Sequence, residues 1–378
     1  EWGKRASSLV VALDDDQAIM EWRGGSPRRM LTLAEDSAYS VDQQILGKSF
    51  RVPRAVHAVA ERWVRRLSMR QEKEYRPRTR YEPVLDERGQ PIYDADGHPI
   101  ERDTGELVEG AAYCVPESIE RPVLVDRIEE EIGRGRSVMV IASCAYMLKP
   151  LIESMRACGL PFHNPFRPTE SRWNPLRGSS GMSSAERVHR YLVGHPDFGD
   201  RARLWTGDDV RAWMTILDAK KAGLRRGVKA ALERLRKDEL TEAEVASLFA
   251  DADALDLAVQ PDLEWFAGAV MGSKARATAY PLQVARKRGP VALASSPQVV
   301  VGTIHSVKGA AADVVYVAPD LSAAGIEQLK TPNGRDQAIR LFYVAMTRAR
   351  EELRLLAPSG RNYLKRRDLL PSDLEVPA

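Results

Sequence analysis

The sequence has little cysteine, no paired metal-binding motif and no long hydrophobic run. Its three cysteines include no Cys-x-x-Cys pair, which argues against a disulfide framework or zinc knuckle and favours the reducing cytoplasm. No apolar run approaches the roughly 18 residues that span a bilayer, and no signal peptide is visible, so no membrane partner is expected. With 44% hydrophobic residues among 378, the chain can still bury several domain cores.

Charges are nearly balanced over the whole chain but unevenly distributed along it. The 56 Lys and Arg residues against 53 Asp and Glu give a net charge of +3, which alone says little about a polyanionic partner. Basic residues nevertheless gather in three windows, at 62–80, 225–237 and 286–288. These windows are compatible with binding to a polyanion.

The hydrophobic pattern predicts an α/β protein. All-apolar runs are typical of buried strands in a parallel sheet, and they occur at 9–13, 137–143, 299–303, 314–317 and 353–356. Amphipathic or capped stretches predict helices at about 53–70, 123–133, 147–158 and 335–350. The strand at 9–13 would have no upstream partner in the sequence, so we expect the chain to begin with a cut through a domain.

Two segments interrupt this α/β pattern. Residues 81–112 are polar and rich in turns, and Asp96-Gly97 is a strong hairpin signal. We interpret Asp94-x-Asp96-Gly97 as a plain turn and not a calcium loop, because the later acidic ligand is missing. Residues 165–294 are mainly helical, and their expected core contains four aromatic residues, Trp205, Trp213, Trp265 and Phe266.

The stretch Asp16 to Gly24 places polar side chains just beyond the first predicted strand. Gln17 and Arg23 could both reach a phosphate there, because ligands of open α/β sheets bind beyond the carboxyl ends of the strands. Trp22 between them could stack on a base. The alternative is a turn at the end of a strand with a tryptophan in the core.

The stretch Gly47 to Pro53 places Phe50 beside Arg51 at a loop-to-helix junction. Such a pair can sandwich a nucleobase and contact a phosphate. The alternative is a structural phenylalanine with a surface arginine. Gly47-Lys48-Ser49 mimics the end of a phosphate loop, but Asp42 stands where that loop needs glycine, so it is no Walker A motif.

Two later stretches also carry polar groups at the ends of predicted elements. Thr303, His305, Ser306 and Lys308 follow an apolar strand and offer donors and one cation to a phosphodiester backbone. The helix predicted at 335–350 carries Arg348 near its end, and an arginine projected toward a nucleotide can neutralise charge during phosphoryl transfer. The alternatives are a structural histidine and a surface arginine.

Together and in this order, the four stretches resemble the third to sixth motifs of UvrD/Rep-like superfamily 1 DNA helicases. The resemblance implies a RecA-like (P-loop NTPase-type) parallel-sheet domain, interrupted by a mainly helical accessory insertion. It implies four parts: a remnant of a first RecA-like domain at 1–34, the second RecA-like domain at 35–164 with a hairpin or loop insertion at 81–112, the accessory domain at 165–294, and the completing part of the second RecA-like domain at 295–378.

The resemblance also implies a set of residues that contact ATP. Gln17 and Arg23 would sense its terminal phosphate, Phe50 would lie on the adenine, and Arg51 would reach the terminal phosphate. Arg348 would be the arginine finger. Gln17, Arg51 and Arg348 are thus the expected catalytic residues.

A second set is implied for DNA. Trp22 would stack on single-stranded DNA, and Thr303, His305 and Lys308 would lie along the strand. The implied partners are single-stranded DNA and duplex junction DNA. The implied function is that of the C-terminal portion of an ATP-dependent 3′-to-5′ helicase or translocase, in DNA repair or replication.

The sequence departs from the family pattern at several points. Met20 stands where the family usually has Tyr, and Ala311 stands where it has the Glu that contacts the ribose, with Asp313 shifted nearby. The phosphate loop and the acidic Mg²⁺ site are not found, so we expect them in a missing N-terminal RecA-like domain and expect no ATP hydrolysis by this chain alone. The alternative is a stand-alone, catalytically dead DNA-binding or regulatory protein derived from a helicase.

Overall fold

The computed structural model describes residues 10–32, 42–178, 181–193, 205–260 and 262–370, without the side chains of Trp22 and Met30. The chain divides into two compact units. One, here called the α/β unit, comprises Glu1–Leu148 and Gly302–Ala378, and the other, the helical unit, comprises Lys149–Val301. None of the described helices has both the length and the apolar character needed to cross a membrane.

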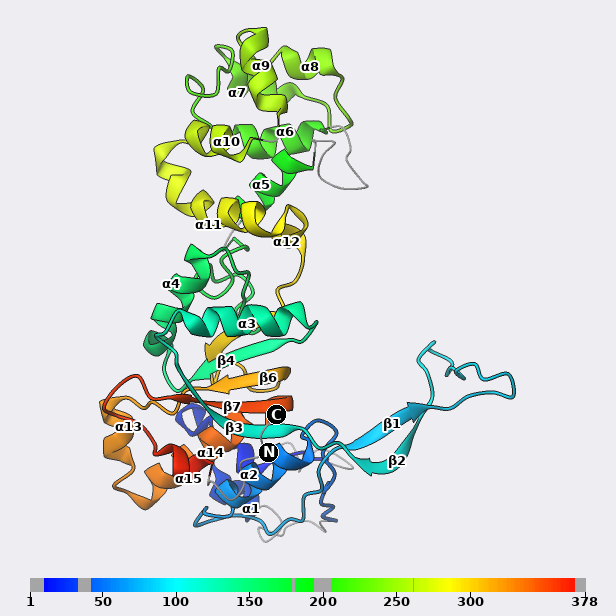
Figure 1. The fold of residues 1–378 in the computed structure, drawn as a ribbon, viewed down its shortest axis with the longest axis vertical. Coiled ribbons are helices and arrows are strands. Elements are labelled where there is room, and N and C mark those ends of the chain that lie inside the picture. The colour runs from blue at the N-terminus through cyan, green and yellow to red at the C-terminus, as the bar shows by residue number, and fades with distance from the viewer. Residues whose placement is uncertain (1–9, 33–41, 179–180, 194–204, 261, 371–378) are drawn as a thin grey trace, which may run out of the picture. The chain divides into compact units, whose positions relative to one another are not determined.

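A parallel five-stranded sheet with the order β3-β7-β6-β4-β5 forms the centre of the α/β unit (Figure 1). Its strands are β3 (Ala111–Ser118), β4 (Val138–Ala142), β5 (Val299–Thr303), β6 (Ala312–Val317) and β7 (Ala349–Ala357). Every residue of β4 is buried, as expected for a strand covered on both faces. The α/β class predicted from the apolar runs and the RecA-like sheet domain implied by the resemblance are confirmed, and the runs that became β4 to β7 were correctly assigned.

The first predicted strand, residues 9–13, is wrong where the structure describes it. Residues 10–13 form no strand, and Val10, Val11 and Leu13 are 93%, 51% and 44% exposed. Leu9 lies outside the described residues. An apolar run becomes a buried strand only beside a neighbour that supplies its backbone hydrogen bonds, and no described strand does so here.

Helices of the α/β unit cover the sheet. They are α1 (Pro27–Leu31), α2 (Arg54–Val64), α3 (Val123–Gly133), α13 (Ala323–Gln328), α14 (Pro332–Met346) and α15 (Arg366–Leu369). The apolar stripe of α2 is buried, and Trp63 packs edge-on against Phe342 of α14 with ring centroids 6.5 Å apart. The indole Nε1 of Trp63 also donates a 2.8 Å hydrogen bond to the carbonyl of Ile339. These contacts pack the last turn of α2 against the middle of α14.

Helix α14 ends at Met346, earlier than the predicted limit of 350. The amide of Ala312 donates a 3.1 Å hydrogen bond to the carbonyl of Arg348, and Ala349 already pairs with β6. The sheet therefore captures the chain directly after Thr347, the C-cap of the helix. Arg348 consequently lies in the link between α14 and β7, and not on the helix.

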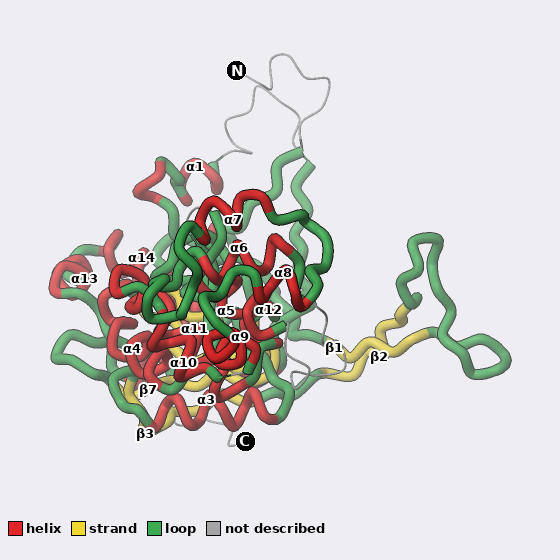
Figure 2. The backbone as a smooth tube through the Cα atoms, turned by 90° about the horizontal axis from the view of Figure 1, so that it is seen from above, coloured by secondary structure: helices red, strands yellow, loops and turns green. Residues whose placement is uncertain are grey.

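The insertion at 81–112 contains the predicted hairpin. Strands β1 (Thr79–Pro83) and β2 (Glu101–Leu107) pair antiparallel and extend as an arm away from the sheet (Figures 1 and 2). At the tip, Gly97 has a φ of +84°, and Asp94 Oδ1 accepts hydrogen bonds from the amides of Asp96 and His98 at 2.9 and 2.8 Å. The Asp94 carboxylate thus closes a turn, as we interpreted it from the sequence.

The helical unit contains helices and no strand of its own among the described residues other than the start of β5. Its helices are α4 (Lys149–Ala157), α5 (Ser184–Leu192), α6 (Gly207–Met214), α7 (Val228–Arg234), α8 (Glu242–Ala246), α9 (Ala252–Val259), α10 (Leu263–Ala269), α11 (Gly272–Arg288) and α12 (Val291–Ala294). Tyr191 lies at the centre of the aromatic core, with ring centroids 5.3 Å from Trp213 and 4.5 Å from Phe266. Three of the four aromatic residues predicted for this core, Trp205, Trp213 and Phe266, are buried, whereas Trp265 is only partly buried and contacts Tyr191 from the side of the core.

Candidate nucleotide and DNA site

Arg348 is the most buried of the candidate residues, with 1% of the residue exposed. Its guanidinium donates hydrogen bonds to the carbonyls of Val344 and Ala310, at 2.8 and 3.2 Å, and to Gln17 Oε1 at 3.2 Å. Two motifs far apart in the sequence therefore meet at one side chain. The arginine holds Gln17 at the start of β6 and β7.

Arg51 joins the same group from the residues that precede α2. Its Nε donates a 2.6 Å hydrogen bond to the carbonyl of Thr347, the residue before Arg348. Burial, and then the positive charge of Arg51, lowers the pKa of Arg348 to about 9. Burial lowers the pKa of Arg51 as well. Both guanidinium groups are thus held partly out of water in each other's field, which costs free energy unless an anion is bound.

Lys308 is the third cation of the group. Its Nζ donates a 2.7 Å hydrogen bond to the main-chain carbonyl of Gln17, and burial lowers its pKa. Among the described residues, no carboxylate forms an ion pair with Arg51, Lys308 or Arg348. These three residues with Gln17 are called the cationic cluster below. The cluster offers several positive donors to a multiply charged anion.

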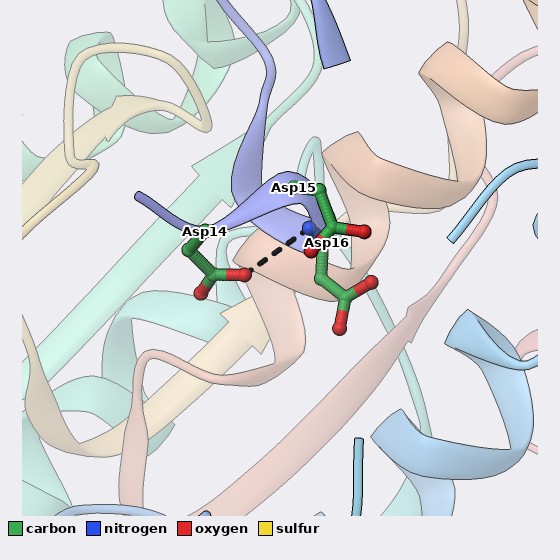
Figure 3. A group of neighbouring side chains, drawn as sticks. All are labelled: Asp14, Asp15 and Asp16. Atoms are coloured by element: carbon green, nitrogen blue, oxygen red, sulfur yellow. Dashed lines mark hydrogen bonds between the residues drawn. The ribbon is translucent and has the colours of Figure 1, made fainter. Parts of the chain in front are cut away.

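Three adjacent carboxylates, Asp14, Asp15 and Asp16, lie directly before Gln17 (Figure 3). Their oxygens are close enough together to suit a metal ion, but Lys73 Nζ already contacts all three and lies 3.4 Å from Asp14 and 3.2 Å from Asp16. Arg70 adds hydrogen bonds of 2.9 and 3.1 Å to Asp16. The ammonium group takes the place of a cation, so these residues do not fit Mg²⁺.

The acidic group instead anchors the segment that carries Gln17. Asp14 Oδ1 accepts a 3.1 Å hydrogen bond from the amide of Asp16, which caps the 3₁₀ turn Asp15–Gln17. Arg340 of α14 donates a 2.9 Å hydrogen bond to the carbonyl of Asp15. Arg70, Lys73 and Arg340 were not among the residues predicted from the sequence, where only the basic window at 62–80 pointed to the first two.

The segment after β5 connects two opposite edges of the sheet. The amide of Ile304 donates a 3.0 Å hydrogen bond to the carbonyl of Ala142, so Thr303 lies beside the C-terminal end of β4. Since β6 runs parallel to β4, the chain must return to the other edge before Ala312. Thr303 therefore lies at the C-terminal edge, whereas Lys308 lies against Gln17. Thr303 and Lys308, which were predicted to belong to one patch, are therefore divided between these edges.

The remaining candidates lie elsewhere on the α/β unit. The Phe50 ring is 71% exposed and lies 6.2 Å from the Tyr81 ring, centroid to centroid. It is therefore not a core residue. Arg23 is exposed at the end of the 3₁₀ turn Glu21–Arg23. The side chain of Trp22 lies outside what the structure describes, and its stacking on DNA stays a prediction.

Asp313 does not take the place of the missing ribose-binding glutamate. Its Oδ2 accepts hydrogen bonds from the amide and the hydroxyl of Ser137, at 2.9 and 2.7 Å. These bonds commit the carboxylate to the start of β4. Asp313 therefore does not replace the carboxylate that Ala311 lacks.

His305→Gln is expected to make the free energy of unfolding less dependent on pH. Burial lowers the pKa of His305 below its ordinary 6.5, so the unfolded chain binds this proton more readily. The stability contributed by the neutral ring is fully present above about pH 6.5 and is lost as the pH falls through the folded-state pKa. Urea unfolding across this window measures the effect. His98→Gln on the exposed arm is the control, and equal pH dependence in wild type and His305→Gln would contradict the expectation.

Comparison with known families bears on this part of the chain. Residues 298–356 match the family model of the UvrD-like helicase C-terminal domain. The match includes β5, β6 and most of β7, together with Thr303, Lys308 and Arg348. No curated protein matches the chain. Helicases are nucleic-acid-binding enzymes, and this chain contains a UvrD-like helicase C-terminal domain, as the four motifs predicted.

Proposed function

We propose that the chain is the C-terminal portion of a cytoplasmic, ATP-dependent 3′-to-5′ DNA helicase or translocase. It would act on single-stranded DNA at duplex junctions, in repair or replication. The observation that carries the proposal is the cationic cluster: Lys308 and Arg348 bind Gln17, and Arg51 binds the carbonyl of Thr347 beside Arg348. None of the three cations has an ion-pair partner among the described residues. A polyphosphate is the common biological ligand that matches several clustered cations.

In this proposal ATP is bound by a first RecA-like domain that carries the phosphate loop, and that domain closes against the cationic cluster. The terminal phosphate would replace the neutral Gln17 amide as the partner of Arg348. A charge-assisted bond to phosphate is stronger than a bond to an amide, which favours closure. Arg51 would contact the same phosphate, and Phe50 and Arg23 would complete the nucleotide contacts. The Asp14–Asp16 group does not fit Mg²⁺, so no step is assigned to it.

Coupling between nucleotide and DNA would pass through the segment from Thr303 to Lys308. Lys308 contacts the main chain of Gln17 at one edge, and Thr303 lies at the other. His305, whose ring lies against the backbone of Ile19, and Trp22 would help Thr303 to contact the strand. A shift of Gln17 on hydrolysis would therefore move Lys308, and through the segment from Lys308 back to Thr303 it would reach the C-terminal edge of the sheet. Alternating grip at that edge would move the DNA past the domain.

Binding of oligothymidylate by the 378-residue chain tests this proposal. We expect the logarithm of the affinity to fall linearly with the logarithm of salt concentration, with a slope of about −0.7 for each phosphate neutralised. We also expect no ATP turnover with or without DNA, because the sequence has no Walker A motif. Salt-insensitive binding, or no binding, would contradict the DNA function, and ATP turnover would contradict the division of the active site.

A catalytically dead DNA-binding or regulatory protein is the second candidate, and Ala311 favours it. The ribose-binding carboxylate is missing at that position, and Asp313 is committed to Ser137. The DNA directly upstream of the coding region separates the two. An in-frame phosphate loop and acidic motif supports the helicase, whereas a start codon immediately before residue 1 supports the DNA-binding protein.

A further inference from the structure

Tyr146 is a large exposed side chain at the end of a fully buried strand. Strand β4 is buried along its whole length, and Leu148 is 0% exposed, but Tyr146 in the intervening 3₁₀ turn Ala145–Leu148 is 60% exposed. The strand before the turn and Leu148 at its end thus pack into the core, the residues next to Tyr146 are partly buried, and Tyr146 itself faces solvent. Such a ring is not explained by packing within the α/β unit.

The turn that carries Tyr146 is held from both sides at the C-terminal edge of the sheet. On one side, the amide of Ile304 donates to the carbonyl of Ala142 at 3.0 Å, which places Thr303 next to the end of β4. On the other side, Ser143 Oγ donates a 2.7 Å hydrogen bond to the carbonyl of Asp320, beyond the end of β6. The backbone just before Tyr146 is therefore held in place at the edge where parallel sheets bind their ligands.

The carboxylate nearest to this turn does not make the edge repellent to a phosphodiester. Asp320 is 5% exposed, and its Oδ1 accepts hydrogen bonds from the amides of Ser359 and Gly360, at 3.0 and 2.9 Å. Backbone donors thus partly compensate its charge. Thr303 and Ser143 add hydroxyl groups on either side of the turn.

The ring does not belong to the proposed nucleotide site. Arg348 lies directly before β7, and Gln17 and Lys308 meet it there, at the N-terminal edge of the sheet. Tyr146 follows β4 and lies at the opposite edge. A base stacked on Tyr146 would therefore come from the nucleic acid and not from ATP.

We infer that Tyr146 stacks on a base of single-stranded DNA that passes along the C-terminal edge of the sheet. The inference rests on the proposed function and adds to it a sequence-tolerant, uncharged contact. Aromatic stacking suits a motor that must hold any sequence, because every base has a flat face. Thr303 would contact the backbone beside that base, whereas the Ser143 hydroxyl stays bound to the carbonyl of Asp320.

Tyr146→Ala is expected to weaken oligothymidylate binding by the 378-residue chain about 5- to 100-fold. Tyr146→Phe should bind like wild type, since stacking needs the ring and not the hydroxyl. The dependence on salt should be unchanged in both variants, because neither removes a charge. Tyr93→Ala is the matched control, because Tyr93 on the hairpin arm is 58% exposed, and its affinity should equal that of wild type.

The outcomes separate this inference from the proposed function. If wild type does not bind single-stranded DNA, the proposed function fails and the inference with it. If wild type binds and Tyr146→Ala binds equally well, the inference is wrong while the function stands. An oligonucleotide containing 2-aminopurine gives an independent readout, because the fluorescence of this base analogue falls when an aromatic side chain stacks on it. Its fluorescence should be quenched by wild type and Tyr146→Phe, and equal fluorescence with Tyr146→Ala would overturn the inference.

Discussion

Arg348→Ala is expected to lower kcat for DNA-stimulated ATP hydrolysis about 10³-fold or more when the chain is joined to a phosphate-loop domain. The guanidinium is held by the carbonyls of Val344 and Ala310 and by Gln17, so it is already positioned beside Arg51. Its pKa of about 9 still leaves it charged at neutral pH, although burial disfavours the charge. Stabilisation of the charge that develops on the transferred phosphoryl group would be lost with it. Steady-state ATPase assays with saturating oligothymidylate measure the effect.

Arg134→Ala is the control for this experiment. Arg134 follows α3, its side chain is 62% exposed and it pairs with Glu131, so its removal should leave kcat unchanged. Both variants should bind single-stranded DNA like wild type. Full ATPase activity in Arg348→Ala would remove the arginine-finger assignment, and a loss of DNA affinity would show that the residue acts on the strand instead.

Lys73→Met is expected to reduce the free energy of unfolding of the α/β unit by about 3–5 kcal/mol. Lys73 is 8% exposed and contacts Asp14, Asp15 and Asp16, of which the last two are almost fully buried. Although burial opposes it, the hydrogen bond to Asp15 and the charge of Asp16 raise the pKa of Lys73. Methionine fills the same space but leaves the buried Asp15 carboxylate without its cation, and Asp16 then has Arg70 as its partner in place of two cations. Urea unfolding measures the loss as a lower midpoint at constant slope.

Arg65→Met tests whether any lost ion pair has this effect. The Arg65 side chain is 68% exposed and pairs with Glu61 at 2.7 Å, so its removal should cost less than about 1 kcal/mol. If Lys73→Met were equally mild, the carboxylates would not depend on Lys73. Stabilisation of that variant by Mg²⁺ would then show that the acidic group accepts a metal ion.

The strands were predictable from the sequence wherever an apolar run also pairs with a neighbouring strand in the folded protein. The runs that became β4, β5 and β6 are apolar because both faces of a parallel sheet are covered. Residues 9–13 have the same composition, but residues 10–13 have no neighbouring strand among the described parts of the chain. A composition pattern does not contain that information. Strand β3 was missed because it lies at the edge of the sheet, where its burial is incomplete and Pro116 is tolerated.

The candidate site was predictable as a set of motifs but not as a geometry. The meeting of Gln17, Arg51 and Arg348 follows the resemblance, whereas the pairing of Asp16 with Arg70 joins residues 54 positions apart that no motif connects. The sequence also did not predict that Thr303 and Lys308 lie at opposite edges of the sheet. This separation arises because the strands on either side of that segment are parallel, so the chain must cross from one edge of the sheet to the other.

The hairpin arm and the loop that carries Phe50 form one mechanical piece. The amide of Arg78, before β1, donates to the carbonyl of Val52 at 2.8 Å, and the amide of Arg54 donates to the carbonyl of Val108, after β2, at the same distance. Lys48 joins the two further through Tyr81 at 2.8 Å. A force on the outer end of the arm is therefore transmitted through these hydrogen bonds to the loop on both sides of Phe50, and so to the Phe50 ring.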